Sequence, residues 1–308
     1  MDSQPDGAPI ETFDEPDQLF ATYRAQVDDA LDRSLPSADE PPAKLHEAMR
    51  YSVFAGGKRL RPILVLASAQ AAGSPANPVL PAACAVELIH TYSLIHDDLP
   101  SFDDDDLRRG KPSNHKVFGV AQAILAGDAL QSLAFSLLAT ATRDADKTRP
   151  WVDVFVELSA AAGSAGMAGG QWLDIEAEGH PIDIVSLEAL HSAKTGALFT
   201  ACVRIGAILG GADDVMKERL DTYGKSLGLA FQIVDDILDV EGSLEDLGKI
   251  PGADEVHAKA TYPGLLGLEG ARAEARRFLD VALKQIEPFG PTAQPLRLIA
   301  NFIVNRSQ

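Results

Sequence analysis

The chain of 308 residues has little of three things: cysteine, positive charge and long uninterrupted apolar runs. Its two cysteines, Cys84 and Cys202, both lie in apolar stretches, which argues against a disulfide scaffold and predicts buried thiols. Lysine and arginine number 27 against 45 acidic residues, and the resulting net charge of -18 argues against a general nucleic-acid binder. An anionic ligand remains compatible with this acidity, because a small basic pocket or bound metal ions can reverse the local sign.

Targeting and membrane signals are also scarce. The first residues, MDSQPDGAPIETFDEPDQ, are acidic and polar, the opposite of a signal peptide. Apolar runs are interrupted before about 18 residues, so we expect no membrane span. The sequence therefore predicts a cytoplasmic protein.

Over most of the chain, apolar residues recur with the spacing of an α-helix. Hydrophobic residues make up 46% of the chain, and alternating strand patterns are rare. Alanine and leucine fill long segments that are apolar around most of their circumference, which predicts an all-α bundle with buried helices. We expect a flexible N-terminal segment over 1–16. No long linker divides the rest of the chain, so we expect a single domain over 17–308. The predicted helices span 17–34, 42–54, 61–73, 79–99, 116–141, 150–177, 186–210, 213–240, 264–286 and 292–305.

Two clusters of aspartate each follow an apolar stretch. Asp235 and Asp239 are four residues apart and share one face of a helix, where like charges repel unless a cation compensates them. In the earlier cluster, Asp104 aligns with Asp97 on an ideal helix, whereas Asp103 needs a distortion such as Pro100 can introduce. Spacing leaves open which of the two meets Asp97, and solvated acidic surfaces are the alternative for both clusters. Carboxylate groups on separate helices suit Mg²⁺, which shares its coordination with substrate phosphates.

Short basic runs are conspicuous in so acidic a chain. They are GGKRLRP at 56–62 and LRRGKP at 107–112, and Lys194 adds a cation on an otherwise apolar helix. Arginine and lysine bind phosphate oxygens, although each one alone could equally form a surface salt bridge. Together with the aspartates, they predict a diphosphate held at the mouth of a bundle that takes up an apolar tail.

These motifs resemble those of the trans-isoprenyl diphosphate synthases, most closely the bacterial farnesyl diphosphate synthases. The resemblance runs from about Tyr51 to the C-terminus and is carried, in order, by GGKRLRP, ELIHTYSLIHDDLPSFDDDDLRRGKPSNHK, GMAGGQWLD, HSAKTGAL, GLAFQIVDDILDVEG, LGKIPGAD and KATY. It implies the isoprenoid synthase helical bundle with a central apolar cavity, usually assembled as a homodimer. One departure is Ser243, where relatives often have an aspartate after the glycine.

The resemblance also implies roles for individual residues. Three Mg²⁺ ions would be held by a DDxxxxD and a DDxxD motif: Asp97, Asp98, Asp103, Asp235, Asp236 and Asp239. The allylic diphosphate would be bound by Arg108, Lys194, Lys249 and Lys259, and isopentenyl diphosphate by Lys58, Arg61, His90 and Arg109. Thr195 and Gln232 would face the developing allylic cation, and with Lys194 they are the expected catalytic residues.

Product length is expected to depend on Tyr92 and Ser93, five and four residues before Asp97. In the family that the chain resembles, a bulky aromatic at the fifth position acts as a floor, so Tyr92 favours the C15 product farnesyl diphosphate over the C20 product geranylgeranyl diphosphate. The alternative is an ordinary core tyrosine. A non-catalytic subunit of a heteromeric synthase is disfavoured by the intact motifs, and a terpene cyclase by the second diphosphate site at Lys58, Arg61 and His90.

Overall fold

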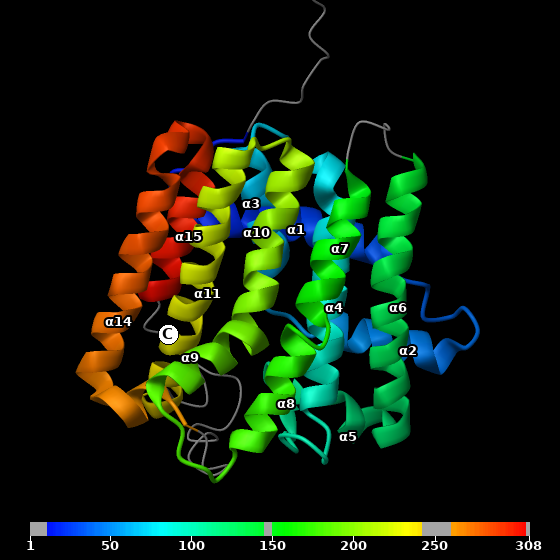
Figure 1. Ribbon diagram of the computed structural model, residues 1–308. Coiled ribbons are helices and arrows are strands. Elements are labelled where there is room, and N and C mark those ends of the chain that lie inside the picture. The colour runs from blue at the N-terminus through cyan, green and yellow to red at the C-terminus, as the bar shows by residue number, and fades with distance from the viewer. Residues whose placement is uncertain (1–10, 145–149, 242–259, 306–308) are drawn as a thin grey trace, which may run out of the picture.

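The computed structural model describes residues 11–144, 150–241 and 260–305, and this part of the chain is almost entirely helical (Figure 1). The prediction of an all-α fold is therefore confirmed. The α-helices are α1 (Pro16–Ser34), α2 (Ala43–Val53), α3 (Leu60–Ala71), α4 (Leu80–Asp97), α5 (Asn114–Phe118), α6 (Val120–Asp144), α7 (Trp151–Ala162), α8 (Met167–Ala177), α9 (Ile184–His191), α10 (Ala197–Gly210), α11 (Asp214–Glu241), α14 (Tyr262–Ile286) and α15 (Gln294–Asn305). Shorter elements are the 3₁₀ turns η1 (Asn77–Val79) and η3 (Glu287–Ala293), the π-helical turn η2 (Ser192–Gly196), and the strands β1 (Leu107–Arg108) and β2 (Lys111–Pro112).

The most apolar helices form the centre of the bundle. Residues Pro62–Ala71 of α3 are all buried, because this helix packs against α10 on one side and α4 on the other. On the flanks, α6 covers α4 and α14 covers α11 (Figure 1). Both cysteines, Cys84 on α4 and Cys202 on α10, are buried and free, as predicted.

Two predicted helices are each divided by glycine. The stretch 116–141 breaks at Gly119, whose φ of 98° is a left-handed conformation that ends α5 before α6 begins. The stretch 150–177 breaks between Gly163 and Gly166, and a β-carbon at Gly166 would lie only 2.2 Å from the carbonyl oxygen of Ala161. Sequence periodicity continues through both breaks, which is why they were not expected.

The hairpin of β1 and β2 was not predicted either. Its turn residues, Arg109 and Gly110, both have positive φ (55° and 74°), the pattern of a tight two-residue hairpin turn. Arg108 pairs with Lys111 in the ladder, whereas Arg109 lies in the turn. The two consecutive arginines are thereby directed to different parts of the site.

Three helical stretches are long and apolar enough to cross a membrane: Asn77–Asp97, Val120–Arg143 and Ile184–Gly210. The sequence had not led us to expect this. In the bundle, 67% of the most apolar window is buried in the first and third stretches, and 33% in the second. Their apolar surface is thus used, in different degrees, for packing against other helices.

The start of the described chain packs against the bundle. Residues 11–15 belong to the segment expected to be flexible, and within them the Phe13 side chain is only 3% exposed and contacts the ring of Tyr23 edge-on at 5.1 Å. The Gln70 amide donates a hydrogen bond to the carbonyl oxygen of Glu11 (2.9 Å). These contacts attach the segment to α1 and α3.

Candidate active site

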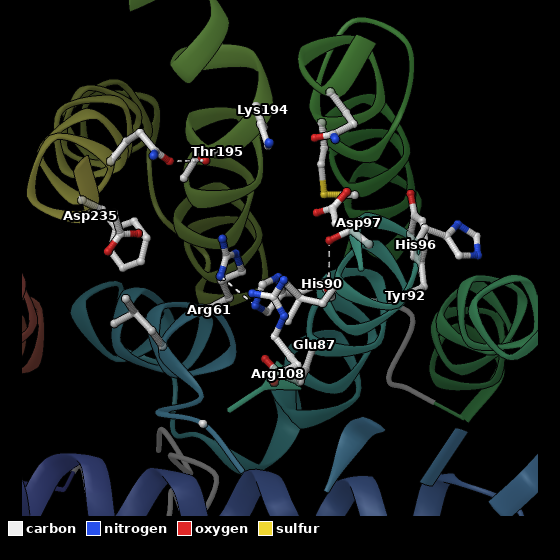
Figure 2. A pocket seen from close by; sticks show the side chains of 18 of the residues that line it. Arg61, Glu87, His90, Tyr92, His96, Asp97, Arg108, Lys194, Thr195 and Asp235 are labelled. Carbon is white, nitrogen blue, oxygen red and sulfur yellow. Dashed lines mark hydrogen bonds between the residues drawn. The ribbon is translucent and has the colours of Figure 1, made fainter. Parts of the chain in front are cut away.

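A cavity of about 690 Å³ lies between α3, α4, α8, η2 and α11, beside the β1–β2 hairpin. Figure 2 shows Asp97 and Asp235 on opposite sides of it, with Lys194 above and Arg61 and His90 below. Most of the predicted site residues line this one space: Lys58, Arg61, His90, Tyr92, Ser93, Asp97, Arg108, Arg109, Lys194, Thr195, Gln232 and Asp235. Lys249 and Lys259, and with them Ser243, lie outside the described residues.

The first aspartate cluster folds back on the end of α4. The Asp103 amide donates to the carbonyl oxygen of Asp97 (2.9 Å), and the Asp104 amide donates to that of Leu99 (3.1 Å). This turn brings Asp103 next to Asp97, the choice that spacing alone left open. Burial raises the pKa of Asp97 to about 6; Lys194 opposes the shift and the Asp103 carboxylate adds to it. A carboxylate in this position gains stability from any cation that enters the cavity.

Asp98 does not line the cavity. It is 2% exposed and is paired with Arg108, whose Nε donates to its carboxylate at 2.8 Å. The Nη2 of Arg108 also donates to Asp105 (2.8 Å). Asp98 and Asp105 therefore orient the Arg108 guanidinium at the edge of the cavity.

In the second cluster, only Asp235 lines the cavity. Asp236 is 2% exposed, and its two oxygens accept hydrogen bonds from the Gln232 amide and from the backbone N–H of Tyr262, both at 3.0 Å. Asp239, one turn further along α11, is 5% exposed. Asp236 thereby joins α11 to the start of α14, while Asp235 faces the cavity.

The donor set fits a divalent cation that is shared with a ligand. Within residues 11–144, 150–241 and 260–305, no group of three histidine, cysteine, aspartate or glutamate side chains is arranged to hold a metal ion by itself. Asp97 and Asp235 instead face each other across the cavity (Figure 2) and offer only oxygen atoms. Mg²⁺ commonly binds to one or two carboxylates, water and substrate phosphates, which matches this arrangement.

Lys194 is held by a residue that the sequence analysis missed. Its Nζ pairs with Asp174 of α8 at 2.6 Å. Lys194 lies in the π-helical turn η2, where a β-carbon at Gly170 of α8 would lie 2.1 Å from its backbone nitrogen. The glycine thus allows α8 to contact η2 closely, which brings Asp174 to the lysine. The motif GMAGGQWLD contains both Gly170 and Asp174. Asp174 is the only aspartate in the motif, and this was the signal that could have identified the partner of Lys194.

Thr195 and Gln232 are linked by a hydrogen bond. The Thr195 hydroxyl donates to Gln232 Oε1 at 2.8 Å, and Gln232 Nε2 donates to Asp236 at 3.0 Å. Figure 2 shows Thr195 on the cavity wall with this first hydrogen bond as a dashed line. This chain fixes the orientation of the Gln232 amide. Because both residues line the cavity, their oxygens are available to positive charge that develops there.

Arg61 and His90 form a pair on the opposite side. Arg61 Nη1 lies 3.0 Å from His90 Nε2, and its guanidinium covers the ring of Phe199 at 5.0 Å. An arginine only donates, so the His90 Nε2 must be an unprotonated acceptor. Burial, followed by the charge of Arg61, lowers the pKa of His90 well below its usual value.

Lys58 and Arg109, the other two predicted cations on this side of the cavity, also have defined packing partners. The Lys58 ammonium lies 5.0 Å from the ring of Phe302. Arg109 packs flat on Gly57, where a β-carbon would lie 2.5 Å from its Cζ. Its Nη1 donates to the carbonyl oxygen of Gly56. These contacts gather Lys58, Arg61 and Arg109 around one region of the cavity.

Arg59 and Glu87, which also line the cavity, form a buried ion pair beside these cations, and the sequence analysis missed this pair as well. Arg59 is 3% exposed and donates to Glu87 (2.7 Å, 1% exposed), to Asp28 (2.7 Å) and to the carbonyl oxygen of Val53 (2.6 Å). Its left-handed φ of 52° precedes α3. A single charged residue in the apolar stretch of α4 was the signal that Glu87 has a buried partner.

His90 gives a prediction for the ligand-free protein. Below its unfolded pKa of about 6.5, an unfolded chain takes up a proton at His90 that the folded protein does not, so stability falls as pH falls. Between pH 7 and 5.5 we expect His90→Asn to remove a pH-dependent loss of about 1 kcal/mol, measured by urea unfolding. His180→Asn, at an exposed position, is the control. Equal pH dependence in His90→Asn and wild type would contradict the buried neutral state.

Tyr92 and Ser93 lie on the α4 wall. Tyr92 is 9% exposed and forms a side-chain hydrogen bond with Gln131 of α6. Ser93 donates to the carbonyl oxygen of His90 at 2.9 Å. Both line the cavity on the same helix as Asp97, as their spacing predicted.

The family model of polyprenyl synthetase matches residues 42–288. The chain is 47% identical over 302 residues to farnesyl diphosphate synthase of Escherichia coli (strain K12), covering 96% of this chain and 100% of that protein. It is 49% identical over 286 residues to heterodimeric geranylgeranyl pyrophosphate synthase large subunit 1, chloroplastic, of Arabidopsis thaliana, covering 91% of this chain and 76% of that protein. A crystal structure of a putative farnesyl-diphosphate synthase from Marinomonas sp. MED121 superposes with a TM-score of 0.81 at 41% identity, covering 95% and 100% of the two chains.

The helical bundle and its cavity between two aspartate clusters define a prenyltransferase. The chain belongs to the polyprenyl synthetase family. This family generally depends on Mg²⁺.

Proposed function

We propose that this protein condenses isopentenyl diphosphate with dimethylallyl and then geranyl diphosphate to form (E,E)-farnesyl diphosphate and release diphosphate. The observation that carries the proposal is that one cavity holds two groups able to bind diphosphate. Asp97 and Asp235 face each other at one of them, and Arg61, His90 and their neighbouring cations form the other. A cyclase needs no second diphosphate site, and a non-catalytic subunit needs neither.

The allylic diphosphate would bind between the two aspartate clusters. Asp97, Asp103 and Asp235 are the residues best placed to hold Mg²⁺, with Asp98, Asp236 and Asp239 supporting them, and we propose three ions. When bound, Mg²⁺ supplies electrostatic stabilisation of the leaving diphosphate. Arg108 and Lys194 contribute positive charge at the same place, and Lys249 and Lys259 are proposed to join them.

Isopentenyl diphosphate would bind to Lys58, Arg61, His90 and Arg109. Condensation begins as the C1–O bond of the allylic diphosphate breaks, and the electron pair leaves with the diphosphate. Thr195 and Gln232 present oxygens to the resulting carbocation. The double bond of isopentenyl diphosphate then forms the new bond to C1, and the proton lost from its C2 passes to the released diphosphate. No side-chain base is required.

We propose that elongation stops at C15 because the Tyr92 ring lies on the cavity wall below the aspartates. The relatives include both farnesyl and geranylgeranyl diphosphate synthases, so the same chemistry ending at C20 is the second candidate. We further propose a homodimer in the cytoplasm, built from a single domain over 17–308, without a membrane span or a nucleic-acid partner.

The test is an incubation with isopentenyl diphosphate, dimethylallyl diphosphate and Mg²⁺, with products separated by chain length. We expect farnesyl diphosphate, and a loss of at least about 100-fold in turnover for Asp235→Asn, because it removes a carboxylate that faces the leaving group. Asp214→Asn is the matched control, since Asp214 is fully exposed on the same helix.

Each other outcome contradicts a different part of the proposal. No product with any allylic primer would contradict the enzymatic activity. A C20 product would contradict only the role of Tyr92. Full turnover of a folded Asp235→Asn variant would remove the metal-binding role of Asp235.

A further inference from the structure

The Tyr92 ring does not stand alone on the cavity wall, because residues of α4 and α6 hold it from behind. α4 and α6 pack along each other, and the pairs Tyr92–Gln131 and His96–Gly127 show that the contact is antiparallel. Tyr92 and His96 are one turn apart on α4 and both line the cavity. Gln131 and Gly127 are one turn apart on α6.

Two kinds of contact restrain Tyr92. The Gln131 side chain forms a hydrogen bond with its hydroxyl, and the ring of His96 packs edge-on against its ring, with 5.7 Å between centroids and planes at 72°. Such aromatic pairs favour one relative orientation. The ring is therefore fixed at both its polar end and its side.

His96 in turn depends on the absence of a side chain at residue 127. Its Nε2 lies 3.1 Å from the carbonyl oxygen of Ile124, which places the ring directly on the α6 backbone. A β-carbon at Gly127 would lie 2.2 Å from that Nε2 and 2.7 Å from Cδ2, too close for any contact. Gly127 has no unusual backbone conformation, since it lies inside a regular helix, where glycine costs stability relative to alanine. The close approach of His96 is the reason for glycine here.

We propose that Gln131 and Gly127 determine product length by holding Tyr92, directly and through His96, in the position that ends the cavity. Neither residue lines the cavity, so each is a positioning residue. A floor sets a sharp length limit only if it stays in place as the growing tail presses on it. A mobile tyrosine would admit the next five-carbon unit in part of the turnovers. This inference rests on the proposed function and concerns only where elongation stops.

The experiment measures the ratio of C20 to C15 product in Gln131→Leu and Gly127→Ala. Loss of the hydrogen bond in Gln131→Leu is expected to raise the ratio about five-fold, the change that one hydrogen bond allows. Gly127→Ala displaces His96 and is expected to raise the ratio at least as much. Gln122→Leu, the same replacement at an exposed site of α6, should leave the ratio unchanged. Gln131→Glu keeps a partner for the Tyr92 hydroxyl and should retain the C15 product.

The same replacements made in a Tyr92→Ala variant distinguish a positioning role from a general structural defect. In Tyr92→Ala, the residue that Gln131 and Gly127 hold is gone, so adding either replacement should not lengthen the product further. A merely structural defect would lower turnover and the unfolding midpoint in every background while leaving the ratio unchanged.

Failure of the inference can be told apart from failure of the proposed function. If the wild type makes C15 and both variants keep its product ratio, the inference is wrong and the proposed function stands. A wild type that ends at C20 would show that Tyr92 is no floor, which overturns the inference but leaves prenyl transfer intact. A wild type that does not elongate any primer would overturn both.

Discussion

Replacing Asp97 by asparagine is expected to lower turnover by orders of magnitude and, at the same time, to make the ligand-free protein more stable. Burial raises the pKa of this carboxyl from 3.8 to about 6, and Asp103 adds to the shift, so at pH 7 the folded protein holds an ionised group that costs about 2–3 kcal/mol. Asparagine has nearly the same shape and no charge. We expect a higher free energy of unfolding by about that amount, and turnover lower by about 1,000-fold.

The pH dependence gives the expected gain a distinctive signature. A raised carboxyl pKa means that the folded state binds the proton more tightly, so the penalty is full above pH 6 and vanishes below about pH 4. The stability gain of Asp97→Asn should therefore disappear as pH falls through this range, measured by urea unfolding. Asp104→Asn is the matched control, because Asp104 is exposed and its φ of 49° suits asparagine. An Asp97→Asn variant with turnover within ten-fold of wild type would contradict the assigned role.

The helical architecture was predictable because it depends on residue spacing. Apolar positions recur with the helical period over most of the chain, and the breakers between them are glycine and proline. What periodicity could not show is where a helix is interrupted by a single backbone conformation. Gly119, Arg109 and Gly110 adopt positive φ at single positions, and the spacing of apolar residues carries no record of one residue's backbone conformation.

The candidate site was predictable where charged residues cluster next to apolar stretches or stand out from the charge of the rest of the chain. Aspartate clusters after apolar helices and basic runs in an acidic chain indicated the cavity residues, and most of them do meet in one space. Spacing could not decide between Asp103 and Asp104, because the decision depends on a backbone turn that returns the Asp103 amide to Asp97. The supporting residues were missed for a related reason: Asp174 and Glu87 are separated by 20 and 28 residues from the cations they pair with.

Arg59 shows how a motif can hide two roles. It lies inside GGKRLRP between residues that line the cavity, and its sequence suggests another phosphate ligand. In the structure, all three guanidinium nitrogens of Arg59 instead donate hydrogen bonds, to Glu87, to Asp28 and to the carbonyl oxygen of Val53, at distances of 2.6 to 2.7 Å. The guanidinium thus joins α1, α2 and α4 to the segment that presents Lys58.

Removing this cation is expected to have the largest effect on folding. Arg59→Met leaves Glu87, at 1% exposure, buried without its arginine, and breaking a buried pair in this way costs about 3–5 kcal/mol. In the double variant Arg59→Met, Glu87→Gln, the buried charge is gone as well, so most of that stability should return. Urea unfolding of the wild type, the two single variants and the double variant measures the coupling. Arg33→Met breaks an exposed pair with Asp29 and should change the stability by less than about 0.5 kcal/mol.

The double variant also separates stability from substrate binding. Glu87 is one helical turn before His90, and Arg59 adjoins Lys58, so loss of the pair releases two residues proposed to bind isopentenyl diphosphate. We expect the refolded double variant to show a KM for isopentenyl diphosphate raised about ten-fold, with the KM for the allylic primer within two-fold of wild type, because none of the three hydrogen-bond partners of Arg59 belongs to an aspartate cluster. Equal changes in both KM values would mean that the pair supports the whole cavity. A stability loss below 1 kcal/mol in Arg59→Met would contradict the role of this buried pair in folding.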